Sequence, residues 1–171
     1  MTARVATVAF QGIEAVAVDV QAQFISGQTL FHVVGLPDKA VAESRERVRN
    51  ALHAIGLGMP FRHITINLAP ADLPKEGSHF DLAIALALMS AMGAIAPDAI
   101  EGALPAAIGA NAMSKGLICA EANGAEAAWA AEDMSILAAP HLLSLVNHFK
   151  GTQTLRRPEP NVAHDTTPMP D

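Results

Sequence analysis

The residues best suited to chemistry lie close together in the segment from Lys75 to Asp81. Ser78 and Lys75 have the residue types of a serine–lysine nucleophile, and His79 with Asp81 offers two side chains of metal-binding type. Side chains two residues apart on a helix diverge, so His79 and Asp81 do not make a metal site by themselves. A lysine three residues away across a turn rarely reaches a serine hydroxyl, and we therefore expect no catalysis from Ser78.

The same segment fits a structural turn that leads into a helix. Ser78 and Asp81 have the spacing of a capping box, in which the hydroxyl accepts from a backbone N–H three residues on and the carboxylate reaches back. The residues predicted to form this turn and helix cap are Lys75, Glu76, Gly77, Ser78 and Asp81. The following run, Leu82 to Met89, is apolar on all sides, which indicates a core helix that is too short to span a membrane.

Two arginines, Arg45 and Arg49, lie one helical turn apart in a second predicted helix, over residues 38–55. This helix is expected to stop at Gly56. Two interpretations remain open. The arginines belong to a solvated, mixed-charge face together with Glu43 and Glu46, or they contact phosphate groups or a partner. We name Arg45 and Arg49 as candidate DNA or partner contacts.

The composition limits the class of protein. The chain has 171 residues, of which 51% are hydrophobic and 16% charged, so we expect one packed domain rather than a disordered chain. A net charge of −6 argues against a broad nucleic-acid-binding face but allows a local basic patch. Cys119 is the single cysteine; we expect it to be a small buried hydrophobe in a reducing cytoplasm. The N-terminus lacks the apolar segment of a secretion signal.

The elements that must position these residues follow from hydrophobic periodicity, which predicts a two-layer α/β (α+β) domain. Residues 4–10 and 13–24 are predicted to form an antiparallel hairpin, because apolar and polar residues alternate in the second segment. The second half alternates strands and helices, which favours a parallel arrangement. Further predicted strands span residues 29–34, 62–68, 117–120 and 135–138. Further predicted helices span residues 103–114, 122–131 and 141–149. Residues 1–150 form the predicted domain and 151–171 a proline-rich linker.

Several long strings resemble one family. VGLPDKAVAESRERVR and NLAPADLPKEGSHFDL are similar to the N-terminal domain of the YifB/ComM proteins, which are magnesium-chelatase-like AAA+ ATPases. The resemblance implies a ribosomal protein S5 domain 2-like fold, shared with the proteolytic domain of Lon. In this family the domain precedes an AAA+ motor and a chelatase-like domain, and members act as hexameric DNA helicases in branch migration during natural transformation.

The chain departs from the patterns that the resemblance implies. The serine of Lon-type peptidases falls at His79 and their general-base lysine at Pro105, so the resemblance implies no peptidase dyad. Family members continue after the region of Gly102 with a hairpin similar to YVVLGELALDGSIRPVAG, whereas this chain passes directly to Ala103. We therefore expect one hairpin of the sheet to be missing. We expect the chain to end in the linker before the AAA+ module, and it contains no Walker A loop.

The resulting expectation is a non-catalytic N-terminal domain that scaffolds or regulates a hexameric DNA-processing motor used in DNA recombination. Its expected partners are the AAA+ motor and the other subunits of a homo-hexamer, with DNA as an indirect partner and no membrane. No cofactor is expected in this chain, since ATP and Mg²⁺ would belong to the AAA+ module. The alternative is a stand-alone protein-interaction module, and a residual Lon-like hydrolase that uses Ser78 or His79 is a third class.

Overall fold

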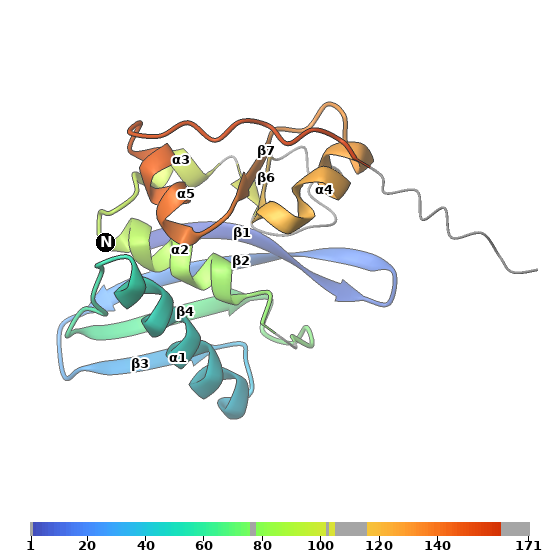
Figure 1. Ribbon diagram of the computed structural model, residues 1–171. Helices are drawn as coiled ribbons and strands as arrows, with labels where there is room; N and C mark the ends of the chain where they lie inside the picture. Colours follow the sequence, from blue (N-terminus) through green and yellow to red (C-terminus); the bar gives the residue numbers. More distant parts are fainter. Residues whose placement is uncertain (1, 76–77, 102, 105–115, 162–171) are drawn as a thin grey trace, which may run out of the picture.

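A computed structural model describes residues 2–75, 78–101, 103–104 and 116–161. Its first half is a four-stranded sheet in the order β1-β2-β4-β3 (Figure 1). β1 (Thr2–Gln11) and β2 (Glu14–Ile25) form the predicted antiparallel hairpin, with Gly12 in the left-handed region (φ 64°) at its turn. β2 then pairs antiparallel with β4 (His63–Ala69) over residues 19–25, so the far end of the hairpin extends past the sheet.

β3 (Leu30–Val34) lies at the outer edge of this sheet and runs parallel to β4. The connection between these parallel strands is α1 (Asp38–Ala54), which confirms the helix predicted over residues 38–55. At the β3–α1 turn, Gly35 has a φ of 99°, and a Cβ atom there would lie 2.6 Å from the carbonyl oxygen of Leu68. Only glycine therefore fits this turn without strain.

The predicted core helix is confirmed as α2 (Asp81–Ala91), in which every residue from Ala83 to Ala91 is buried. It packs on β1 and β2, and α1 packs beside it on the same side of the sheet. The inward-facing residues of three strands complete the core beneath the two helices. They include Val5, Val18, Val20, Ala22, Ile64, Ile66 and Leu68.

The predicted helix cap at Ser78 is wrong. α2 begins at Asp81, and its N-cap residue is Phe80, in a helical conformation and without a side-chain cap. Ser78 contributes its backbone carbonyl, which accepts from the Asp81 N–H at 3.0 Å. The turn before the helix is thus closed by the backbone, and the carboxylate of Asp81 is free to bind a side chain of α1.

The second half of the chain contains the predicted parallel strands. β5 (Ala103–Leu104), β6 (Gly116–Ala120) and β7 (Ile136–Ala139) form a parallel sheet in that order. Within the described residues, its helical elements are α3 (Pro97–Glu101), the short 3-10 helix η2 (Glu121–Asn123), α4 (Gly124–Ala130) and α5 (Leu142–Phe149). The expected helix over residues 103–114 is wrong at its start, because Ala103 and Leu104 pair with β6 as a strand. Residues 105–115 and Gly102, where the hairpin was expected to be missing, lie outside the described residues.

The two halves share a core along β1. Val8, on the outer face of β1, packs with Leu117 and Cys119 of β6, whereas Ile118 of β6 joins the main core. Cys119 is buried as predicted, and burial raises the pKa of its thiol. No helix within the described ranges has the length and apolar character needed to cross a bilayer.

The segment from Gly151 to Asn161 has no helix or strand but lies against the second half of the domain. The Arg157 guanidinium donates to three backbone carbonyls just beyond α4, those of Ala131 and Glu132 at 2.8 Å and Met134 at 3.2 Å. The Leu155 N–H donates to Nδ1 of His148, near the end of α5, at 3.1 Å. We call residues 151–161 the strap.

Candidate functional site

The two arginines named from the sequence lie in one groove. Arg45 and Arg49 project from α1 toward the end of the sheet where β3 and β4 begin. The groove has a volume of about 330 Å³. Its lining comprises the cations Arg45, Arg49 and Arg62 together with Thr29, Leu30, Phe31, Met59, Pro60, Phe61 and Ile64. We call this the arginine groove.

The local sequence explains why these side chains converge. α1 buries Ser44, Val48 and Leu52, so the residues immediately after the first two, Arg45 and Arg49, fall on the flank of the helix. β3 and β4 are parallel and begin at the same end of the sheet, where the chain from α1 returns through residues 55–62. That return segment places Phe61 and Arg62 at the mouth of the groove.

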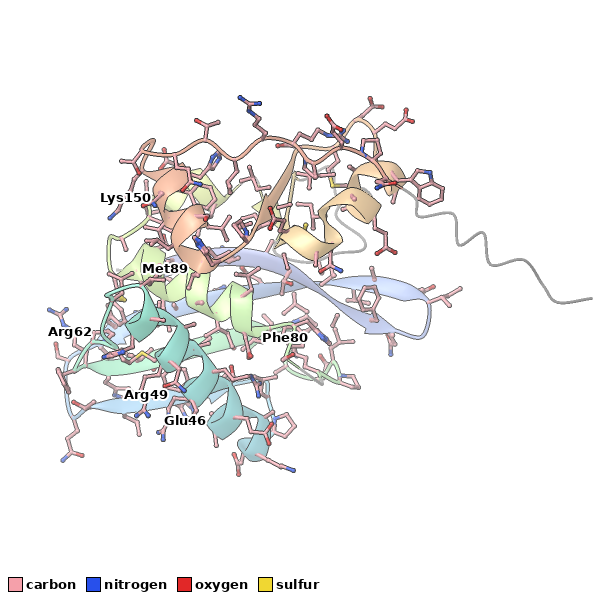
Figure 2. The ribbon with its side chains drawn as sticks, in the orientation of Figure 1. Glu46, Arg49, Arg62, Phe80, Met89 and Lys150 are labelled. Atoms are coloured by element: carbon pink, nitrogen blue, oxygen red, sulfur yellow. The ribbon has the colours of Figure 1, made fainter. Side chains whose placement is uncertain are left out.

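The positive charge of the groove is only partly neutralised. Nη2 of Arg49 lies 2.7 Å from Oε2 of Glu46, and Nη2 of Arg45 lies 3.6 Å from the other oxygen of the same carboxylate. Figure 2 shows Arg49 and Glu46 together on α1 and Arg62 at the end of the sheet. Arg62 has no carboxylate partner among the described residues. The groove is thus lined by three guanidinium groups, and one carboxylate pairs with two of them.

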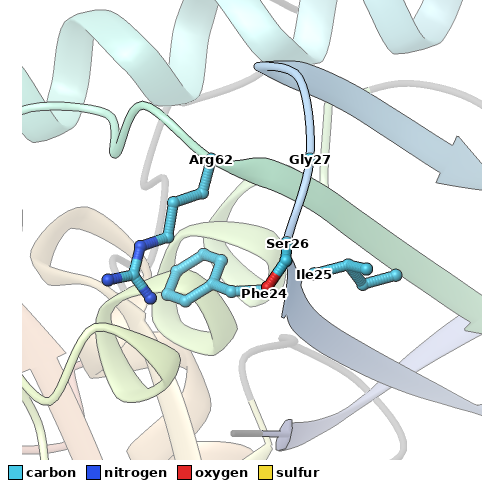
Figure 3. Close-up of a pocket in the computed structure, with 5 residues that line it drawn as sticks. All are labelled: Phe24, Ile25, Ser26, Gly27 and Arg62. Atoms are coloured by element: carbon cyan, nitrogen blue, oxygen red, sulfur yellow. The ribbon is translucent and has the colours of Figure 1, made fainter.

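Arg62 also lines a second, smaller hollow of about 240 Å³ with Phe24, Ile25, Ser26 and Gly27 (Figure 3). Its side chain extends alongside the ring of Phe24. Arg62 thus connects two adjacent depressions at the same end of the sheet. The sequence reasoning missed Arg62 and Phe61. The available signal in the sequence was an aromatic residue next to an arginine, in a short segment that contains glycine and proline. In the structure Phe61 is 92% exposed.

The turn from Lys75 to Asp81 does not bring its polar side chains together. Lys75 is only 4% exposed, and its ammonium donates to the carbonyl of Leu73 at 3.0 Å and to that of Pro70. Burial lowers the pKa of Lys75, and Asp72 acts in the opposite direction. The Lys75 ammonium therefore stabilises the loop before α2 through hydrogen bonds within that loop, and it is not directed at the Ser78 hydroxyl. Glu76 and Gly77 lie outside the described residues.

Asp81 joins the two helices of the first half. Nε of Arg47 donates to the Asp81 carboxylate, and Nη2 of Arg47 lies 3.4 Å from its other oxygen. Arg47 also lies 3.7 Å from Glu43, one turn earlier on α1. His79 packs against Phe80 with ring centroids 4.9 Å apart. The part of the chain that the structure describes contains no group of three metal-binding side chains.

Comparisons with known proteins give a consistent family. The sequence pattern of the family described as subunit ChlI of Mg-chelatase matches residues 20–101. Competence protein ComM of Haemophilus influenzae is 33% identical over 165 residues, which is 86% of this chain and 32% of that protein. The uncharacterised protein YifB of Escherichia coli is 33% identical over 170 residues, or 89% of this chain and 33% of that protein. The chain thus spans about a third of the length of these relatives.

A third relative matches a shorter part of the chain at higher identity. An uncharacterised protein of Mycobacterium tuberculosis is 44% identical over 88 residues, which is 52% of this chain and 18% of that protein.

Proposed function

Because the chain belongs to the family of ComM and YifB and carries its ChlI-type region over residues 20–101, we propose that it is the non-catalytic N-terminal domain of a magnesium-chelatase-like AAA+ ATPase. Its role is to scaffold or regulate a hexameric motor that processes DNA, and the similarity to the competence protein of Haemophilus influenzae supports this role. ATP and Mg²⁺ are the cofactors of the motor module. The assembly acts in the cytoplasm.

The similarity to ComM and YifB over most of this chain is the observation that carries the proposal. The β1-β2-β4-β3 sheet with two helices on one side supports the assignment to the S5 domain 2-like, Lon-like fold. In this arrangement residues 1–150 form the domain, and residues 151–171 lead toward the motor. The arginine groove is the surface through which the domain contacts its partners.

A chimera tests this function. This chain replaces the matching third of the Haemophilus influenzae relative, and DNA-stimulated ATP hydrolysis is compared with that of the relative lacking this third. We expect the chimera to restore regulation by DNA, and the Arg45→Glu/Arg49→Glu chimera to lose it while retaining basal hydrolysis. Equal behaviour of the relative with and without the domain would contradict the proposal.

A stand-alone protein-interaction module is the second candidate, and the apolar lining of the arginine groove favours it. The chimera separates the two, because an independent module would leave ATP hydrolysis unchanged.

A further inference from the structure

We propose that the arginine groove and the adjacent open edge of β3 bind an extended, acidic segment of a partner polypeptide, which adds to β3 as a further strand. The inference rests on the proposed function, since it names the class of partner that the groove contacts. It also specifies the backbone conformation and the charge of that partner.

The first supporting observation is the open edge. β3 is the last strand in its sheet and pairs with β4 on one side only in the described part of the chain. An edge strand presents unpaired N–H and C=O groups, which an extended peptide can satisfy by strand addition. Leu30, His32 and Val34, at alternate positions along β3, are all exposed. The edge therefore offers both main-chain bonds and apolar side-chain contacts.

The second observation is the apolar character of the groove at the start of β3. Leu30 is 51% exposed although it lies in a strand, and Phe61 is almost fully exposed beside it. Met59 and Ile64 line the same depression. Large apolar groups that gather next to an open edge are typical of a docking site for side chains of an added strand.

The third observation is the excess of positive charge. Arg45, Arg49 and Arg62 surround the groove, with Glu46 as the carboxylate that pairs with the first two. Carboxylates of a docked segment would accept hydrogen bonds from the guanidinium groups that Glu46 does not neutralise. Arg62, which does not pair with Glu46, is the main such donor. The complement of this surface is thus a chain in which acidic and apolar residues alternate.

A polypeptide fits these observations better than a nucleic acid. Glu46 lies among the arginines, so the groove is not a continuous positive surface for a phosphate backbone. Most lining side chains are apolar, and an open strand edge has no complement in a nucleic acid. A short peptide uses the edge, the apolar lining and the arginines together.

The test uses the full chain and three fluorescein-labelled probes. These are a peptide of about ten residues with alternating valine and glutamate, the same peptide with lysine for glutamate, and an oligothymidylate. We expect the glutamate peptide to bind, and the Arg45→Glu/Arg49→Glu variant to weaken that binding by about tenfold or more. Arg156→Glu, at an exposed arginine of the strap, is the matched control and should leave binding unchanged.

Amide hydrogen exchange then locates the bound peptide. The N–H groups of β3 should exchange more slowly when the glutamate peptide is present, whereas those of β1 should not change. Circular dichroism shows whether the double substitution disturbs α1. If it does, Arg62→Glu is the second variant, because Arg62 lies outside that helix.

Three results would overturn the inference. One is no binding of the glutamate peptide at about 1 mM. Another is binding without the predicted specificity, seen either as no added protection of β3 or as equal affinity for the lysine peptide. The third is tighter binding of oligothymidylate at the same arginines, which would make the groove a nucleic-acid site. The proposed function would survive each of these results, because it depends on regulation of ATP hydrolysis in the chimera.

Discussion

At the scale of single residues, polar side chains of the turn from Lys75 to Asp81 hold this part of the domain together through hydrogen bonds and an ion pair. In the structure the Ser78 hydroxyl caps nothing, Asp81 binds Arg47 of α1, and Lys75 binds backbone carbonyls. Lys75 and its partner Leu73 are 2 residues apart in the sequence, whereas Asp81 and Arg47 are 34 residues apart. The spacing of residues along a helix or turn predicts only contacts between near neighbours in the sequence.

Ser78→Ala should therefore change stability little. Ser78 is exposed and its contribution to α2 is a backbone carbonyl, so we expect a change within about 0.5 kcal/mol in the free energy of unfolding. Urea denaturation measures it. A loss of about 1 kcal/mol would instead indicate a side-chain cap that forms in solution.

Lys75 should give the unfolding free energy a measurable pH dependence. Its pKa is lowered by burial, so between its folded and unfolded pKa values the unfolded chain binds more protons than the folded one. Stability therefore rises with pH toward the ordinary lysine value of about 10.4, by at most about 1.4 kcal/mol per pH unit. As pH falls through the folded pKa, this contribution is lost.

Urea denaturation across alkaline pH tests this effect, with Lys75→Met as the variant without a titrating group. The stability of the wild type relative to this variant should increase with pH. Lys39→Met, at an exposed lysine of α1, is the control. A pH-independent difference between the wild type and Lys75→Met would contradict the assigned burial of the ammonium.

At the scale of elements, much of the fold could be predicted because the periodicities are strong. Alternation in β2 and β4 and the helical spacing in α1 each reflect one buried face, and the continuous apolar run of α2 reflects burial on nearly all sides. Boundaries were predicted less well. The start of α2 depends on a backbone turn, and Ala103 and Leu104 join a strand because β6 lies beside them. Small apolar residues occur in both helices and strands. Pairing with β6 therefore determines that these two residues form a strand.

The β3–α1 turn provides a test at this scale. Gly35→Ala places a Cβ atom against the Leu68 carbonyl and forces a φ of 99° on an L-residue. Gly12→Ala, in the β1–β2 turn, has a φ of 64° but open space around it. We expect Gly35→Ala to be more destabilising than Gly12→Ala by at least about 1 kcal/mol in thermal or urea unfolding. Equal losses would mean that the close approach to β4 relaxes at little cost.

The candidate site was predicted in part. Arg45 and Arg49 were found because their helical spacing places them on one flank of α1. Arg62 and Phe61 lie in the same groove because the chain returns from α1 to β4, and β4 lies next to β3. This neighbourhood depends on the order of the strands in the sheet, which the local sequence does not reveal. The open edge of β3 has the same origin.

At the scale of the whole molecule, the strap links the elements of the second half. Arg157 holds the carbonyls that follow α4, and Leu155 is bonded to His148 of α5. The proline-rich sequence of residues 151–171 predicts a linker, because a proline-rich segment without periodicity gives no local sign that one arginine fixes part of it. The strap therefore has a defined place on the domain.

Limited trypsin digestion tests this attachment. Arg157→Ala removes three hydrogen bonds, so the strap should open more often and cleavage after Arg156 should become several-fold faster. Thr154→Ala, at an exposed position of the strap, serves as control and should be cut at the wild-type rate. Unchanged cleavage in Arg157→Ala would show that the strap is held by its apolar contacts instead.

We propose that this domain works as part of an ATP-driven motor. The most direct measurement is immunoprecipitation from the source cells with an antibody raised against this domain, followed by the mass of the captured polypeptide and ATP hydrolysis in the precipitate. We predict ATP hydrolysis above that of a mock precipitate, with a polypeptide far larger than 17.8 kDa or a co-precipitated AAA+ partner. A 17.8 kDa polypeptide without ATP hydrolysis would contradict a role in a motor.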